Sequence, residues 1–265
     1  MTASPTHGLA ASGPVETWLD RDEALLRLRL DRPKANIIDS EMIASLSQAL
    51  AAYTEPGPVR AAVLDSEGPH FSFGASVEEH LPEKCAEMLS SFHDLMRVML
   101  EWPRPILVVV RGQCLGGGLE LALAGSLIFA SRDAKLGQPE IKLGVFAPAA
   151  SCLLPLRIGQ GAAEDLLFSG RSVDATEAKA LGLVHAVADD PEAAALAYFD
   201  THLATKSASS LAWAVDAVRE SFVPQVERRI AHVERVYLNH LMQTRDAKEG
   251  LEAFIAKRSP RWEHR

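Results

Sequence analysis

Hydrophobic and polar positions alternate near the start of the chain in the pattern of a β-strand. From Leu26 to Leu30, leucines alternate with arginines, and a period of two places successive side chains on opposite faces of a half-buried strand. Val59–Asp65 predicts a second strand. Ile106–Val110 and Leu127–Ala130 are apolar throughout, as expected for strands that are buried on both faces of a parallel sheet.

Helical periodicity separates these predicted strands. After Ser40, a typical helix-capping residue, apolar residues recur at helical spacing from Met42 to Leu50. A second helix is predicted from Glu83 to Glu101, with one apolar stripe, and the prolines that follow it end the pattern. Strands that alternate with helices indicate an α/β fold with a mostly parallel sheet built from βαβ units.

After about Ser172 the predicted elements are almost all helices. Each is too short to bury its own apolar face, so we expect this part to pack on the first part or on a neighbouring subunit. The sequence therefore predicts a core with the active site in residues 1–190 and a helical part in residues 191–265 that joins subunits into a homo-oligomer. The helical patterns lie at Ala175–Leu181, Pro191–Thr205, Ser209–Ser221, Gln225–Thr244 and Ala247–Lys257.

Charge and composition argue against several classes of protein. The chain has 265 residues and a net charge of −8, and it has no basic stripe of the kind that binds nucleic acid. No apolar stretch reaches the roughly 18 residues of a membrane span, and Met1–Pro14 lacks the apolar core of a signal peptide. The three cysteines have no spacing typical of a zinc site. We expect a soluble cytoplasmic protein without a metal.

A glycine-rich segment is the first candidate for chemistry. The predicted strand Ile106–Val110 leads into Gly112–Gly118, and a helix is expected at Leu119–Ala124. Glycines let a ligand approach the unpaired amides at the start of a helix. The segment therefore predicts either an oxyanion or phosphate hole, or a tight turn with unusual backbone angles. It matches neither a P-loop nor a dinucleotide-binding fingerprint.

Two carboxylates accompany this segment. Glu120 lies in the first turn of the predicted helix among apolar neighbours, where it either complements the helix dipole or faces a cavity that raises its pKa for proton transfer. Glu140 lies in the predicted loop that follows. A loop glutamate is usually solvated, but two carboxylates around one water can divide the roles of base and acid. The histidines and cysteines lack the spacing of metal ligands or of a nucleophile with its base.

Together these segments resemble the crotonase (enoyl-CoA hydratase) superfamily. The resemblance runs from about residue 15 to the C-terminus. It implies a spiral of ββα units with a helical C-terminal part, assembled as a trimer or a dimer of trimers. The motifs that carry it are Arg32–Asn36, Phe71–Ser76, Val110–Glu120, Leu136–Glu140 and Phe168–Val184.

The resemblance also implies roles for individual residues. The amides of Ala75 and Gly117 would form the oxyanion hole for a thioester carbonyl, while Glu120 and Glu140 would hold and activate water. Coenzyme A would be part of the substrate, and no separate cofactor is implied. Phe254 and Lys257 resemble a pair that meets CoA from a neighbouring subunit. The residues expected to bind CoA are Lys34, Ala35, Phe73, Ala75, Phe254 and Lys257.

Some segments resemble one branch of the superfamily more than ordinary hydratases. Ser76 replaces the usual Asp, and Phe146-Ala147-Pro148 replaces the usual Ile-Pro-Gly. The branch hydrates cyclic dienoyl-CoA in anaerobic benzoyl-CoA degradation. The resemblance implies 1,4-addition of water to cyclohexa-1,5-diene-1-carbonyl-CoA, giving 6-hydroxycyclohex-1-ene-1-carbonyl-CoA. Phe146 and Pro148 would then shape the ring pocket, or else pack at a helix start.

Three other functions stay open at this point. A general 2-enoyl-CoA hydratase would share both glutamates, and the fold also hosts CoA isomerases and ring hydrolases. A non-catalytic binding protein with the same fold is the third. The acidic net charge and the presence of both carboxylates argue against this last function.

Overall fold

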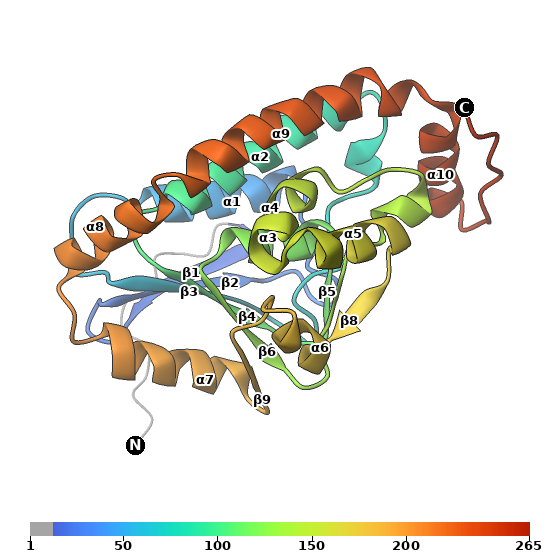
Figure 1. The fold of residues 1–265 in the computed structure, drawn as a ribbon. Helices are drawn as coiled ribbons and strands as arrows, with labels where there is room; N and C mark the ends of the chain where they lie inside the picture. The colour runs from blue at the N-terminus through green and yellow to red at the C-terminus, as the bar shows by residue number, and fades with distance from the viewer. Residues whose placement is uncertain (1–12) are drawn as a thin grey trace.

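The computed structural model describes residues 13–265, and its centre is a six-stranded sheet in the order β1-β2-β3-β4-β6-β9 (Figure 1). β1 pairs antiparallel with β2, and all other neighbours are parallel, so the predicted mostly parallel sheet is confirmed. The sequence pattern did not predict β1, because Val15 is its only buried residue. The strands are β1 Val15–Asp20, β2 Leu25–Leu30, β3 Ala61–Ser66, β4 Ile106–Val110, β6 Leu127–Ser131 and β9 Ala186–Ala188.

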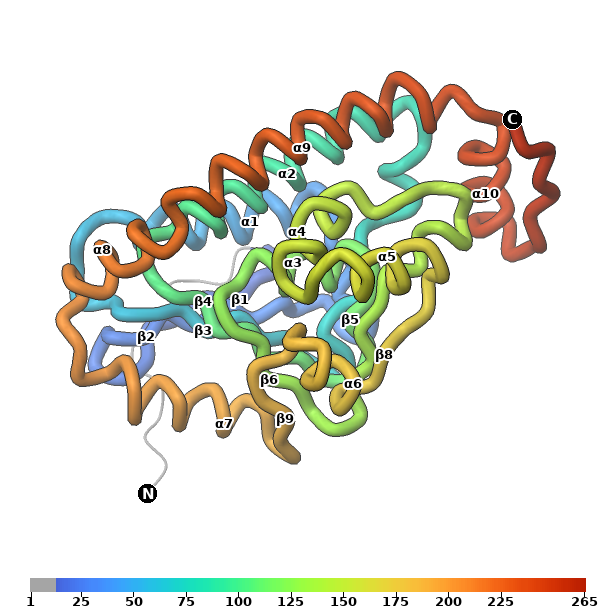
Figure 2. The backbone as a smooth tube through the Cα atoms, in the orientation of Figure 1, coloured from blue at the N-terminus to red at the C-terminus, as the bar shows by residue number. Residues whose placement is uncertain are grey.

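Both faces of this sheet are covered. The tube in Figure 2 shows α7 (Pro191–Tyr198) along one face of the sheet and α1 (Ser40–Ala51) and α2 (Cys85–Glu101) on the opposite side, with α9 (Phe222–Asn239) lying over α2. The larger core includes Leu26, Leu28, Leu30, Leu64, Val108 and Val110. The smaller core, under α7, includes Leu25, Val63, Leu107, Val109, Phe129, Ala195 and Phe199.

A second, three-stranded sheet carries the elements that matter for chemistry. Its order is β5-β7-β8, with bounds Gln113–Leu115, Lys135–Gly137 and Ser172–Asp174. The chain passes from β4 through β5 into α3 (Gly117–Ala124), and then from β6 through β7 into the 3-10 turn η2 (Pro139–Leu143). This succession matches the predicted spiral of ββα units. Strands of three residues are too short for a pattern of alternation to reveal.

The structure adjusts several predicted boundaries. The helix α3 begins two residues before the predicted Leu119, because the glycines are part of its first turn. The segment Phe71–Ser76, expected as a strand end, makes only single bridges, at Ser72 and Ala75. The remaining elements are η1 Glu78–His80, α4 Pro148–Ile158, α5 Gln160–Ser169, α6 Ala175–Ala180, η3 Phe199–Leu203, α8 Ala208–Arg219, η4 Leu241–Gln243 and α10 Arg245–Ile255.

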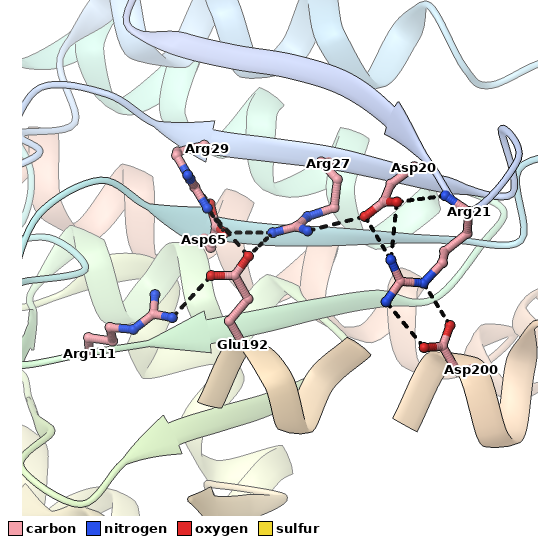
Figure 3. A network of polar contacts seen from close by, with 8 residues as sticks. All are labelled: Asp20, Arg21, Arg27, Arg29, Asp65, Arg111, Glu192 and Asp200. Atoms are coloured by element: carbon pink, nitrogen blue, oxygen red, sulfur yellow. Dashed lines mark hydrogen bonds and ion pairs between the residues drawn. The ribbon is translucent and has the colours of Figure 1, made fainter. Parts of the chain in front are cut away.

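A network of ion pairs joins α7 to the sheet (Figure 3). The buried carboxylate of Asp65 accepts hydrogen bonds from Arg27 at 2.9 Å and from Arg29 at 2.8 and 2.7 Å. Glu192, on α7, accepts from Arg27 and, at 3.1 Å, from Arg111. The arginines of β2 therefore do not form the exposed face that a half-buried strand implies, because α7 covers them and supplies the opposite charge.

Candidate active site

Two backbone segments meet at the predicted oxyanion hole. A methyl group on Gly117 would lie 2.9 Å from the amide nitrogen of Ala75, so the segments can approach only because residue 117 has no side chain. Ile38 bonds to the Gly74 carbonyl and the Ser76 amide, which leaves the intervening Ala75 amide directed away from Ile38. Within residues 13–265, neither the Ala75 nor the Gly117 amide has a backbone partner. The structure thus brings together two amides that are available to one oxyanion.

The segment that carries Ala75 is held by Arg32–Asn36. The Ser72 hydroxyl donates to the Asn36 carbonyl at 2.7 Å and accepts from the Gly74 amide at 3.0 Å. The Phe73 amide donates to the Ala35 carbonyl at 2.9 Å. Ala35 and Phe73, both predicted to bind CoA, are therefore adjacent, and Phe73 is 44% exposed.

Glu120 is buried against the start of a helix. Its carboxylate accepts a hydrogen bond at 2.8 Å from the amide of Ala150, in the first turn of α4. Such amides have no intrahelical partner and carry partial positive charge. Burial raises the pKa of Glu120, and the bonds from Ala150 and Ala149 lower it only in part. A carboxylate with a raised pKa suits proton transfer, and this role of Glu120 stays a prediction.

Glu140 lies in η2 rather than in an open loop. A methyl group on Gly116 would come within 2.5 Å of its Oε1 atom, so the carboxylate lies against the glycine-rich turn. Burial raises the pKa of Glu140, and the negative charge of Glu120 raises it further. Two nearby carboxylates resist ionising together. This is the property expected of an acid and a base that share one site.

Gln138 is a site residue that the sequence analysis did not assign. Its side chain is buried, and with the amide nitrogen turned toward Glu140 it donates to both carboxylate oxygens, at 3.1 and 3.0 Å. Gln138 therefore fixes the orientation of the Glu140 carboxylate. The available signal was its place in the segment Gly137-Gln138-Pro139-Glu140, directly before Pro139 and Glu140.

Phe146 and Pro148 both lie where α4 begins. Pro148 is buried at the first helical position, where a missing N–H is tolerated. The Phe146 ring meets the ring of Tyr237 edge to face, with centroids 5.2 Å apart. The packing role that we considered as an alternative is therefore present. Contact of these residues with a substrate ring stays a prediction.

The other predicted CoA ligands lie on the surface. Lys34 is exposed, Phe254 on α10 is 53% exposed, and Lys257 follows the end of that helix. Their role in binding CoA stays a prediction. Residues 13–265 contain no cluster of His, Cys, Asp or Glu that could hold a metal ion. No helix in this range is long and apolar enough to cross a membrane.

Comparison of the sequence with known proteins assigns the chain to a family. The model of the enoyl-CoA hydratase/isomerase family matches residues 20–265. The chain belongs to this family. It is 60% identical over 255 residues to cyclohexa-1,5-dienecarbonyl-CoA hydratase of Thauera aromatica, covering 96% of this chain and 99% of the relative. It is 34% identical to a probable enoyl-CoA hydratase of Bacillus subtilis, over 91% of this chain and 96% of that protein.

Solved structures support the same assignment of fold. An enoyl-CoA hydratase/isomerase from Pseudoalteromonas atlantica superimposes with a TM-score of 0.83 at 28% identity, covering 94% of this chain and 99% of that one. The predicted crotonase-type fold is therefore confirmed, as is the prediction that the chain is a hydratase of this family.

Proposed function

We propose that this protein adds water to cyclohexa-1,5-diene-1-carbonyl-CoA by 1,4-addition, giving 6-hydroxycyclohex-1-ene-1-carbonyl-CoA, in the anaerobic degradation of benzoyl-CoA. The observation that carries the chemistry is the pair of carboxylates, the buried Glu120 and the half-buried Glu140, beside the available amides of Ala75 and Gly117. The name of the Thauera aromatica relative supports the choice of substrate.

The reaction begins when the oxygen of water forms a bond to the β-carbon of the conjugated thioester. One carboxylate of the pair takes a proton from that water, because its raised pKa makes it an effective base near neutral pH. Negative charge develops on the thioester oxygen, where the Ala75 and Gly117 amides stabilise it. Each such donor contributes about 3–4 kcal/mol in related oxyanion holes.

The enolate of a cyclic diene extends over the second double bond. A proton delivered to its far end by one of the glutamates leaves the remaining double bond conjugated with the thioester. One water has then been added, with no change of oxidation state and no cofactor. Protonation at the far carbon distinguishes this reaction from ordinary enoyl-CoA hydration, in which the α-carbon is protonated.

The test is incubation of the purified protein with the cyclic dienoyl-CoA and, separately, with crotonyl-CoA. We expect the cyclic thioester to gain the mass of one water and to be strongly preferred in kcat/KM. Equal efficiency with crotonyl-CoA would instead assign a general 2-enoyl-CoA hydratase.

The proposal extends to assembly and location. The helix α8 has no buried residue, and Trp213 and Val218 on it are 73% and 81% exposed. Exposed apolar area of this kind typically marks an interface, so we assign a homotrimer or a dimer of trimers, which light scattering at micromolar concentration would reveal. A monomer there would refute this assembly. The three buried, unbridged cysteines are compatible with the reducing cytoplasm.

A further inference from the structure

The helix α10 packs its backbone directly on the turn that carries Glu140. A methyl group added to Gly250, in the middle of α10, would overlap the carbonyl oxygen of Leu143, the last residue of η2. Only a residue without a side chain permits so close an approach of two backbones. The end of η2 therefore rests on the backbone of α10.

The ring of Trp262 lies where η2 and α10 meet. Gly144 ends η2 in the left-handed conformation, with φ 73°. A methyl group there would lie 3.0 Å from the Cζ3 atom of Trp262, and one on Gly250 would lie 3.0 Å from the Cη2 atom. Two bonded atoms of one ring thus lie against glycines of both elements. Trp262 is 39% exposed, so most of its surface is covered.

Carboxylates of α10 hold the backbone on both sides of this tryptophan. Asp246 accepts hydrogen bonds from the amides of Glu263 and His264 at 2.6 and 2.7 Å. Glu249 accepts one from the amide of Arg261 at 2.7 Å. Hydrogen bonds to a charged acceptor are stronger than those between neutral groups. The ring therefore has a fixed place rather than a loose contact.

The position of the Glu140 carboxylate depends on the end of η2. The Gly144 amide donates to the Ile141 carbonyl at 3.2 Å, and the Val145 amide donates to the carbonyl of Glu140 itself at 3.3 Å. These bonds are long, so they hold the turn only weakly without packing. The carboxylate fits closely against Gly116, where a methyl group would come within 2.5 Å of Oε1. A shift of Gly144 would therefore move Glu140 out of this fit.

We propose that Trp262 is a positioning residue for Glu140, because its ring clamps the end of η2 on α10 and so fixes the carboxylate beside Gly116. This inference rests on the proposed hydration activity, in which Glu140 acts as acid or base. It assigns a role in catalysis to a side chain that supplies no atom to the reaction.

The test compares Trp262→Ala and Trp262→Phe with the wild type in hydration of the cyclic thioester. We expect Trp262→Ala to lower kcat about 10-fold or more, because a misplacement of about 1 Å can cost about 100-fold, while KM changes less than about 2-fold. Trp262→Phe keeps a ring that reaches less far, so its kcat should be intermediate. Phe168→Ala removes a ring on α5 that is 71% exposed. It is the matched control and should retain wild-type kinetics.

A second variant releases the ring without removing it. Asp246→Ala deletes the acceptor of the two amides that follow Trp262. It should also lower kcat, with KM near the wild-type value. Circular dichroism should show wild-type helix content in each variant, so that a lower kcat does not reflect unfolded protein. If Trp262→Ala does not fold, Trp262→Phe and Asp246→Ala decide the question by the same two constants.

Three results would overturn the inference. Wild-type kcat in folded Trp262→Ala, with an active wild type, would show that Glu140 does not need the ring and would leave the proposed function standing. A raised KM with unchanged kcat would assign Trp262 to the binding of CoA instead. If the wild-type protein hydrates neither thioester, the proposed function itself is wrong, and the role of Trp262 is wrong with it.

Discussion

The contact between Gly117 and Ala75 gives a sharp prediction for Gly117→Ala. The added methyl group would lie 2.9 Å from the Ala75 nitrogen and 3.0 Å from its Cβ, whereas ordinary contact begins at 3.4 Å. The two segments must therefore separate by about half an ångström. The methyl group would also stand beside one of the two oxyanion donors. Loss of one such donor lowers rates by about 100-fold or more.

We expect Gly117→Ala to lower kcat/KM for hydration by about 100-fold, with the circular dichroism spectrum unchanged. The matched control is Gly161→Ala in α5, where an added methyl group meets no atom within 4 Å. This control should retain wild-type kinetics. A Gly117→Ala enzyme that keeps more than about a third of wild-type kcat/KM would refute the assignment of these amides as the oxyanion hole.

Three more predictions concern the site. Glu120→Gln and Glu140→Gln should each lower turnover by orders of magnitude, while calorimetry should show near-normal binding of CoA thioesters. A variant that keeps more than about a tenth of wild-type turnover would exclude that residue as acid or base. The raised pKa of Glu140 means that the folded state binds its proton more tightly than the unfolded state. The tighter proton binding stabilises the folded state fully below the unfolded pKa of about 4.5. This stabilisation is lost as the pH rises through the raised pKa of Glu140 in the folded state. Glu140→Gln should therefore melt higher than the wild type at pH 8 but not at pH 4, and the same difference at both would contradict the raised pKa. In Phe146→Ile/Pro148→Gly, preference for the cyclic thioester over crotonyl-CoA should fall in kcat/KM, and an unchanged ratio would place the cause elsewhere in the pocket.

The sequence predicted the elements with strong periodicity and the residues that lie in continuous motifs. The strand Ile106–Val110 is found with the predicted bounds, because an apolar run flanked by proline and glycine has few alternatives. Glu120 and Glu140 lie close enough for the charge of Glu120 to raise the pKa of Glu140, while their catalytic roles stay a prediction. The strands β5, β7 and β8 have three residues each, and no periodicity can be read from so few.

Residues from distant elements were harder to predict. Tyr237 lies on α9, far along the chain from Phe146, and the contact between their two rings depends on how α9 packs against α4. The same is true of Arg27, which reads as an exposed strand position until α7 covers it. Gln138 is different, because it lies within a recognised motif, but only its geometry shows that it donates to Glu140.

The ion-pair network under α7 constrains how this protein can vary. Arg27, Arg29 and Arg111 all contact Glu192, and Asp65 is enclosed by two of these arginines. Removal of Asp65 alone would leave the buried Arg27 with Asp20 and Glu192 as its remaining partners, and loss of one partner from a buried ion pair destabilises proteins by up to about 3–5 kcal/mol. Replacement of the whole set by apolar residues of similar size carries no such penalty. Substitutions at these positions should therefore be tolerated together rather than singly, so that β2, β3 and α7 evolve as one unit.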